Sequence, residues 1–208
     1  DLDPAGMKYY TAIDVQHHGT SVVVSRTGYT GEDGFEIVMP ATDAERIWLT
    51  LIEHGAKYSV VPAGLGCRDT LRLESAMPLY GHELNEMVDP LTAGLGFAVK
   101  FNKPDYPGKA ALELIRSRGL EMARVGLILE GRRIAREESP IHIDGDKAGR
   151  VTSGTFSPTL QKVIAMAYVP VASSSPGTVV DVNLRGTLVR ATVVALPFYK
   201  RRHINPAT

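Results

Sequence analysis

Short apolar runs separated by glycine and polar residues fill the first forty positions of the chain. In each run, apolar side chains recur at every second residue or form a short continuous stretch, which is typical of strands that have one face in a core. The pattern predicts three strands, at residues 12–16, 21–25 and 34–39.

Helical spacing replaces this alternation after residue 41. A helix is predicted to begin at Thr42, where Glu45 would complete a capping box, and Gly55 would end it. A second helix is predicted over about 62–75, because Pro62 suits a first helical turn. A short third helix should follow Pro107 and stop at Gly119. The first part of the chain therefore mixes helices and strands.

The pattern changes again after Gly119, where short strand-like segments follow one another without a long helix. Asp144-Gly145-Asp146 and Arg185-Gly186 are typical of turns between such strands. Six strands of this kind predict a small antiparallel barrel or a sandwich. The strands are predicted at residues 122–130, 140–143, 149–153, 161–170, 179–184 and 188–198.

The segment 25–34 carries three glycines between two apolar runs, and it predicts a strand, a tight turn and a second strand. Glu36 lies inside the second strand. Alternation puts Phe35 and Ile37 on one face of the strand and Glu36 on the other. A charge there lies at a solvated edge or is held for a purpose, and the segment alone leaves both readings open.

Composition narrows the classes of function. The formal net charge of zero and the absence of a basic run argue against nucleic-acid binding. A single cysteine, Cys67, leaves no internal disulfide and suits a reducing compartment. No apolar run reaches the roughly 20 residues of a membrane span, and no signal peptide is visible. The six histidines form no HxxH or HxxxH pair, so no metal site is predicted. Whether a targeting region precedes Asp1 stays open.

Several ordered motifs then add a resemblance. GYTGEDG at residues 28–34 is followed by Glu36, AGLGCRDTLRLE occupies 63–74, and PLYG occupies 78–81. Together they resemble the aminomethyltransferase, or T protein, family of the glycine cleavage system. The resemblance covers nearly the whole chain, with further stretches at residues 90–96, 124–127, 149–154 and 165–170.

The resemblance implies an α+β fold in three parts. Residues 1–105 would be the remainder of a folate-binding α+β domain, and 106–120 would form a connecting helix. Residues 121–208 would form a small six-stranded antiparallel β-barrel or jelly-roll-like domain.

The resemblance also implies a folate site. Glu36 would accept two hydrogen bonds from the pterin of tetrahydrofolate, Tyr29 would stack on a folate ring, and Arg68 would hold a carboxylate or support the folate. The residues alone allow other readings. Glu36 can be an edge-strand charge, Tyr29 can pack over the glycine turn, and Arg68 can pair with Asp69 or Glu74. Arg72, one turn later, is interpreted as structural.

Three further residues are weaker matches to the family. Tyr199 would be a folate contact beyond the Pro197-Phe198 pair. Arg124 and Arg136 would lie near the opening that receives the arm of a partner protein. No acid in the chain matches the family's essential aspartate, so no catalytic residue is assigned, and the chain alone is expected to be inactive.

The implied reaction moves the methylene carbon from the aminomethyl-lipoyl arm of H protein to tetrahydrofolate, with release of ammonia. The implied location is the cytoplasm of a bacterium or the mitochondrial matrix of a eukaryote. Two alternatives stay open: a folate-dependent demethylase related to sarcosine and dimethylglycine enzymes, and a non-catalytic folate-binding regulator. The regulator is disfavoured because GYTGED at residues 28–33 stands in place of its KGCYxGQE stretch.

Overall fold

The computed structural model describes residues 3–17 and 19–201, which divide into two compact units between Leu71 and Arg72. The division falls within one helix, so the last turn of that helix belongs to the second unit. The first unit contains η1 (Pro4–Gly6), β1 (Ala12–His17), β2 (Thr20–Ser25), β3 (Glu36–Val38), α1 (Ala41–Gly55), η2 (Ala56–Tyr58) and most of α2 (Leu65–Glu74).

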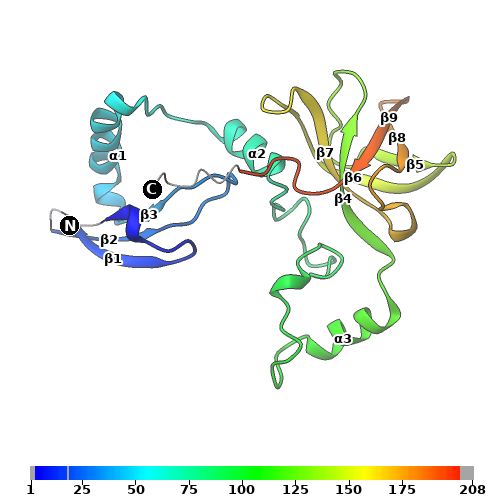
Figure 1. Ribbon diagram of the computed structural model, residues 1–208, viewed down its shortest axis with the longest axis horizontal. Helices are drawn as coiled ribbons and strands as arrows, with labels where there is room; N and C mark the ends of the chain where they lie inside the picture. Colours follow the sequence, from blue (N-terminus) through cyan, green and yellow to red (C-terminus); the bar gives the residue numbers. More distant parts are fainter. Residues whose placement is uncertain (1–2, 18, 202–208) are drawn as a thin grey trace, which may run out of the picture. The chain divides into compact units, whose positions relative to one another are not determined.

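The first unit is an antiparallel three-stranded sheet with α1 packed against one face (Figure 1). The strand order is β1-β2-β3, so β3 is an edge strand. Val22 and Val24 of β2 point toward Ile47 of α1, and Met7 joins them in a small core. The predicted alternation is confirmed for Ile37, which packs against this core, and for Glu36, which is exposed. Phe35, predicted on the same face as Ile37, lies before the strand and is exposed.

The connection between β2 and β3 differs from the tight turn that the sequence predicted. Ser25 pairs with Glu36, so residues 26–35 form a long loop rather than a two-residue hairpin. Of the three glycines, Gly31 has a positive φ of 77°. The tight-turn prediction is wrong because side-chain contacts, described below, shape this loop in place of a standard turn.

The start of α1 corrects the sequence prediction. The helix begins at Ala41 after Pro40, and no side chain caps it; the Thr42 hydroxyl donates to Asp43, so the capping box is not formed. The predicted end at Gly55 is confirmed, and the site favours glycine because a Cβ there would lie 2.7 Å from Cβ of Val60. The second predicted helix, α2, begins at Leu65, three residues later than Pro62.

The second unit contains a closed six-stranded barrel, as predicted (Figure 1). Every neighbouring pair is antiparallel, and the order around the barrel is β4-β7-β6-β5-β8-β9. The last strand ends at Val194, earlier than predicted. The elements of this unit are η3 (Gly96–Ala98), α3 (Lys109–Arg118), β4 (Met122–Leu129), β5 (Pro140–Ile143), β6 (Asp146–Ser157), β7 (Lys162–Pro170), η4 (Val171–Ser173), β8 (Val179–Leu184) and β9 (Thr187–Val194).

Two-residue turns set the register of two barrel hairpins. Asp144 and Gly145 join β5 to β6 with φ values of 53° and 92°. Arg185 and Gly186 join β8 to β9 with φ values of 55° and 86°. Positive φ at both positions is characteristic of type I′ turns, whose twist matches that of the flanking strands. Both predicted turns are confirmed.

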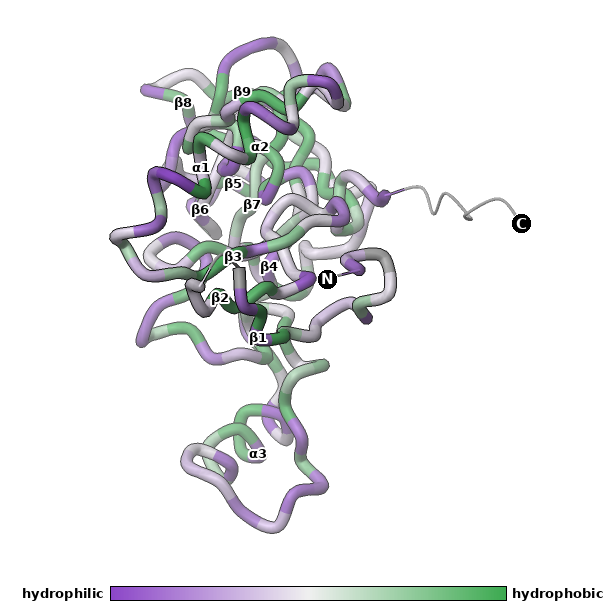
Figure 2. Tube along the Cα trace, turned by 90° about the vertical axis from the view of Figure 1, so that its left-hand side faces the viewer, coloured by the Kyte–Doolittle hydropathy of each residue, from purple (hydrophilic) through white to green (hydrophobic). Residues whose placement is uncertain are grey.

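Strand β7 is buried on both faces. Its inward residues, such as Ala165 and Ala167, belong to the barrel core. Its outward residues Ile164 and Met166 are covered by a second cluster that includes Leu73 of α2. The hydropathy colouring in Figure 2 shows hydrophobic stretches on the barrel strands, whereas α3 has both hydrophobic and hydrophilic residues. This double burial explains why β7 reads as a continuous apolar run in the sequence.

A close approach at Gly154 of β6 gives a first testable prediction. A Cβ at this position would lie 2.2 Å from the backbone oxygen of Ala135, and a backbone atom cannot move aside as a side chain can. Gly154→Ala is expected to lower the free energy of unfolding by about 1–3 kcal/mol, measured by urea titration. Gly96→Ala is the control, because its Cβ would meet only Leu91 at an ordinary 3.5 Å. Equal stability of the two variants would contradict the prediction.

The division between the two units, after Leu71, lies well before the predicted connecting segment 106–120. The reason is that α2 buries its last turn within the second unit, where Arg72, Leu73 and Glu74 are almost fully inaccessible. The strand-rich part does begin after Gly119, and the proposed domain limits stay a prediction.

Candidate functional site

The candidate site in the first unit starts from Glu36 on edge strand β3. Its carboxylate is exposed, and Oε2 accepts a hydrogen bond from the Thr27 hydroxyl. Thr27 lies at the start of the 26–35 loop, so the loop folds back on the strand that follows it. The arrangement fixes one oxygen of a solvent-facing carboxylate, which suits it to accept hydrogen bonds from a bound molecule.

Tyr29 and Arg68 meet in the same unit. The guanidinium carbon of Arg68 lies 4.7 Å from the centroid of the Tyr29 ring, which is a cation–π distance. Arg68 lies on the first turn of α2 and is exposed, and Tyr29 is half-buried. The structure therefore brings together two of the three principal predicted residues. Glu74, one alternative ion-pair partner of Arg68, is engaged with Ser157 and Thr159.

The glycine-rich loop also holds an ion pair that the sequence did not predict. Both carboxylate oxygens of Asp33 accept hydrogen bonds from Arg26, at 3.0 and 2.6 Å. The hydrogen bond to Asp33 raises the pKa of Arg26. Two charges in a glycine-rich stretch were the available signal, but their pairing across the loop is not visible in the pattern.

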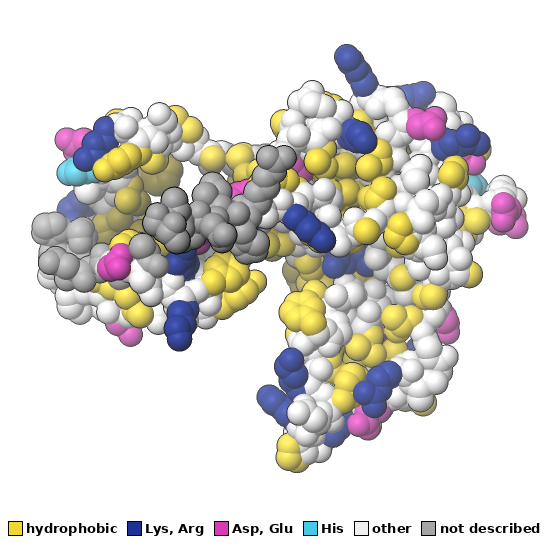
Figure 3. Space-filling view, in the orientation of Figure 1, with side chains coloured by type: hydrophobic (Ala, Val, Ile, Leu, Met, Phe, Trp, Pro, Cys, Tyr) yellow, Lys and Arg dark blue, Asp and Glu magenta, His cyan; other side chains and the backbone are white. Residues whose placement is uncertain are grey.

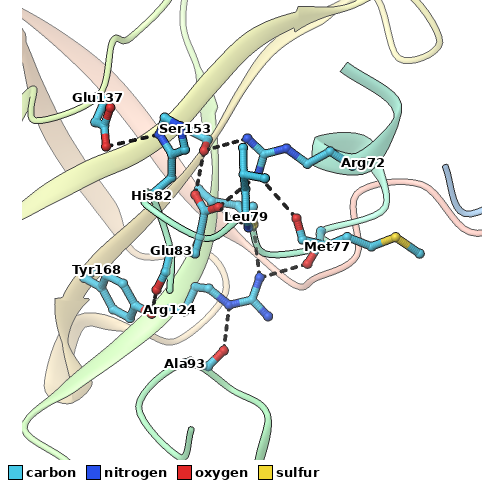
Figure 4. Close-up of polar contacts among 12 residues, drawn as sticks. Arg72, Met77, Leu79, His82, Glu83, Ala93, Arg124, Glu137, Ser153 and Tyr168 are labelled. Carbon is cyan, nitrogen blue, oxygen red and sulfur yellow. Dashed lines mark hydrogen bonds and ion pairs between the residues drawn. The ribbon is translucent and has the colours of Figure 1, made fainter. Parts of the chain in front are cut away.

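The three residues that match the family more weakly, Arg124, Arg136 and Tyr199, lie in the second unit. Arg124 donates to the backbone oxygens of Ala93 and Ala76, each at 2.8 Å, so its side chain links the two segments that contain these residues (Figure 4). Arg136 is exposed next to the buried Ala135. Tyr199 is half-buried, and its backbone N–H donates to the backbone oxygen of Glu74. The roles of these residues toward folate or a partner stay predictions.

A buried charge network anchors α2 in the second unit. Arg72 donates to Glu83 Oε2 at 2.9 Å and to Ser153 Oγ at 2.8 Å, and Ser153 donates to Glu83 Oε1 at 2.6 Å (Figure 4). Arg72 is 2% exposed and Glu83 is inaccessible. A buried charge is tolerated when it is paired and hydrogen-bonded in this way. The structural reading of Arg72 is confirmed.

Neighbouring polar residues extend this scaffold. Glu74 accepts hydrogen bonds from the hydroxyls of Ser157 and Thr159, at 2.5 and 2.8 Å. The Tyr168 hydroxyl donates to the backbone oxygen of Glu83 at 2.8 Å, and burial raises the pKa of Tyr168 to about 12. Sequence reasoning did not single out Glu83, because its partners lie far away along the chain.

A pocket of about 490 Å³ also lies in the second unit. Its lining combines apolar residues with both signs of charge, and it includes none of the predicted folate residues. Among the described residues, no group of three potential metal ligands gathers. Within residues 3–17 and 19–201, every helix is too short or too polar to span a bilayer.

Comparison with known proteins places these features in a family. The family described as "GCVT N-terminal domain" matches residues 1–103, and the "Glycine cleavage T-protein C-terminal barrel domain" matches residues 123–200. The two matches cover the mixed α+β part and the six-stranded barrel, respectively. The chain belongs to the glycine cleavage T-protein family.

Individual relatives support the same family. The aminomethyltransferase of Streptomyces avermitilis is 49% identical over 207 residues, which are 97% of this chain and 56% of that protein. The aminomethyltransferase of Symbiobacterium thermophilum is 50% identical over 184 residues, or 88% of this chain and 49% of that protein. The crystal structure of the glycine cleavage system aminomethyltransferase T from Bartonella henselae matches with a TM-score of 0.89 at 33% identity, covering 97% of this chain and 55% of that one. The chain spans about half the length of the relatives it matches.

Proposed function

We propose that this chain forms the folate-binding part of an aminomethyltransferase of glycine cleavage. The reaction would move the methylene carbon from an aminomethyl-lipoyl group on H protein to tetrahydrofolate and release ammonia. The observation that carries the proposal is the exposed carboxylate of Glu36, held by Thr27 on an edge strand in a chain of this family.

The chemistry of Glu36 fits a reduced pterin. The pterin ring presents an N–H and an exocyclic amino group side by side, and one carboxylate can accept hydrogen bonds from both. Because the acceptor is ionised, these bonds are stronger than those between neutral groups. The Thr27 hydroxyl would limit the rotation of the carboxylate, so less entropy is lost when the pterin binds.

Tyr29 and Arg68 would complete the binding surface. The ring of Tyr29 could take a folate ring on its face, and Arg68, which lies over that ring, could turn toward a folate carboxylate. No residue of this chain is assigned an acid–base role. Its contribution would be to hold the folate, and orientation of two reactants is worth up to about 7–11 kcal/mol of the barrier in favourable systems.

We propose tetrahydrofolate as the co-substrate and lipoylated H protein as the partner. We propose no metal for the reaction. The relatives named above are bacterial proteins. This supports the cytoplasm of a bacterium over the mitochondrial matrix as the proposed location. We also propose that the chain by itself does not turn over, since it holds no assigned catalytic residue.

The test replaces Glu36 with glutamine, which keeps the shape but removes the charge and one acceptor. The affinity for tetrahydrofolate should fall by about 1.5–3 kcal/mol, measured by titration calorimetry. The variant is made in this chain and in a chimera in which the chain replaces the matching segment of the Streptomyces avermitilis aminomethyltransferase. Glu53→Gln on the exposed face of α1 is the matched control and should bind normally. Unchanged affinity in Glu36→Gln would remove Glu36 from the site.

The same chimera separates the proposed reaction from the demethylase alternative. With aminomethylated H protein it should form methylenetetrahydrofolate and ammonia. With sarcosine or dimethylglycine and a suitable oxidase it should form none above the rate without protein. Turnover only in the second assay would replace the proposed reaction by demethylation.

A further inference from the structure

We infer that Arg26 and Asp33 are positioning residues that hold the 26–35 loop in the conformation in which Tyr29 and Glu36 face the substrate. The inference rests on the proposed folate site. It concerns residues that do not themselves meet the ligand, and it is carried by the contacts that Arg26 makes with three separate segments of the first unit.

The backbone of Arg26 is fixed by the sheet. Its N–H donates to Thr11 and its C=O accepts from Tyr10, each at 3.0 Å, so it extends the pairing of β1 with β2 by one residue. The start of the loop is therefore as firmly placed as the strand before it. Any freedom of the loop lies in the residues beyond Arg26.

The side chain of Arg26 removes much of that freedom. Nε and Nη2 bind the two oxygens of Asp33 in a fork, at 3.0 and 2.6 Å, and Nη1 donates to the backbone oxygen of Met7 at 2.6 Å. The guanidinium carbon also lies 5.8 Å from the centroid of the Phe35 ring. A planar guanidinium that uses all three of its nitrogens in this way has one orientation, which a lysine could not reproduce.

The pair closes the loop around the proposed ligand-binding residues. Tyr29 lies between Arg26 and Asp33 in the chain, and Glu36 follows Asp33 by three residues. Thr27, the hydrogen-bond donor to Glu36, comes directly after Arg26. With both ends of the segment tied to one guanidinium, the Thr27–Glu36 contact and the place of Tyr29 are set before a ligand arrives. Preorganisation of this kind lowers the entropic cost of binding.

The solvent exposure of Arg26 and Asp33 limits how much their ion pair contributes to the stability of the fold. The side chains of Arg26 and Asp33 are 22% and 28% exposed. Ion pairs that reach solvent contribute little to global stability, so the effect of breaking this pair should appear in binding rather than in unfolding. The pair of Arg46 and Asp43 on α1 gives a comparison, because it has a single contact at 2.7 Å in the same unit.

The experiment uses Asp33→Asn and Arg26→Lys in the chain and in the chimera. Each should weaken tetrahydrofolate binding about tenfold, by misplacing groups without removing them, while the urea midpoint stays near that of the unaltered protein. Asp43→Asn, which breaks the comparison pair, should leave the affinity unchanged. The double variant Asp33→Asn/Glu36→Gln should lose less affinity than the sum of the two single losses, because part of the effect of Asp33 acts through Glu36.

The outcomes separate this inference from the proposed function. Loss of affinity in Glu36→Gln with full affinity in Asp33→Asn and Arg26→Lys would overturn the inference alone. Additive losses in the double variant would also overturn it, since Asp33 would then act independently of Glu36. An absence of tetrahydrofolate binding by both the chain and the chimera would overturn the proposed function and the inference with it.

Discussion

Replacing Glu83 with glutamine is expected to lower the free energy of unfolding of the second unit by about 3–5 kcal/mol. The substitution keeps the size of the side chain but removes the charge that faces the buried guanidinium of Arg72. It also turns an amide group toward Ser153 or the Leu79 N–H, both of which donate to the carboxylate in the native protein. The loss should therefore approach that of breaking a fully buried ion pair.

Urea unfolding followed by circular dichroism measures this loss. The only tryptophan, Trp48, lies on α1, so its fluorescence reports the first unit and should change little. Glu138→Gln is the matched control, because its ion pair with Arg150 at 2.5 Å is largely exposed. Exposed pairs contribute about 0–1 kcal/mol. Equal losses in the two variants would mean that burial does not determine the strength of the Arg72–Glu83 pair.

The second large effect is expected in the barrel interior. Leu127 of β4 is inaccessible and lies in the core cluster that fills the barrel. Its strand is paired with β7 on one side and β9 on the other, so the backbone cannot collapse into the space that a smaller side chain leaves. Leu127→Ala should lower the free energy of unfolding by about 2–5 kcal/mol.

The control for this substitution is Leu114→Ala on α3. Leu114 is 62% exposed, and alanine is a good helix former, so this variant should stay within about 0.5 kcal/mol of the native protein. Both variants are compared by urea titration under the same conditions. A loss below about 1 kcal/mol for Leu127→Ala would show that the barrel core is loosely packed.

The barrel could be predicted because its signals are local. Strands β5 and β8 have the predicted limits, since two-residue turns with glycine at the second position set where each hairpin reverses. The long loop before Glu36 could not be predicted, because β3 has only three paired residues and the loop depends on contacts between Arg26 and more distant segments.

The buried charge network could not be predicted from the sequence either. Arg72 reaches Glu83 across 11 residues and Ser153 across 81, and no periodicity of the sequence encodes such pairs. Of the candidate site, the motif order led to Glu36, Tyr29 and Arg68. The structure adds the cation–π contact of Tyr29 with Arg68 and the hydrogen bond from Thr27 to Glu36. The binding role of these residues stays a prediction until the affinity measurements are made.

Closure of the barrel has a consequence for synthesis of the protein on the ribosome. Strand β4 begins at Met122, yet one of its two partners is β9, which ends at Val194. The seam between them can form only after the last strand has left the exit tunnel. Until then β4, β7 and β6 can pair as an open sheet with an unprotected edge on β4. The nascent chain therefore passes through a stage in which this edge is available to chaperones or to another nascent chain.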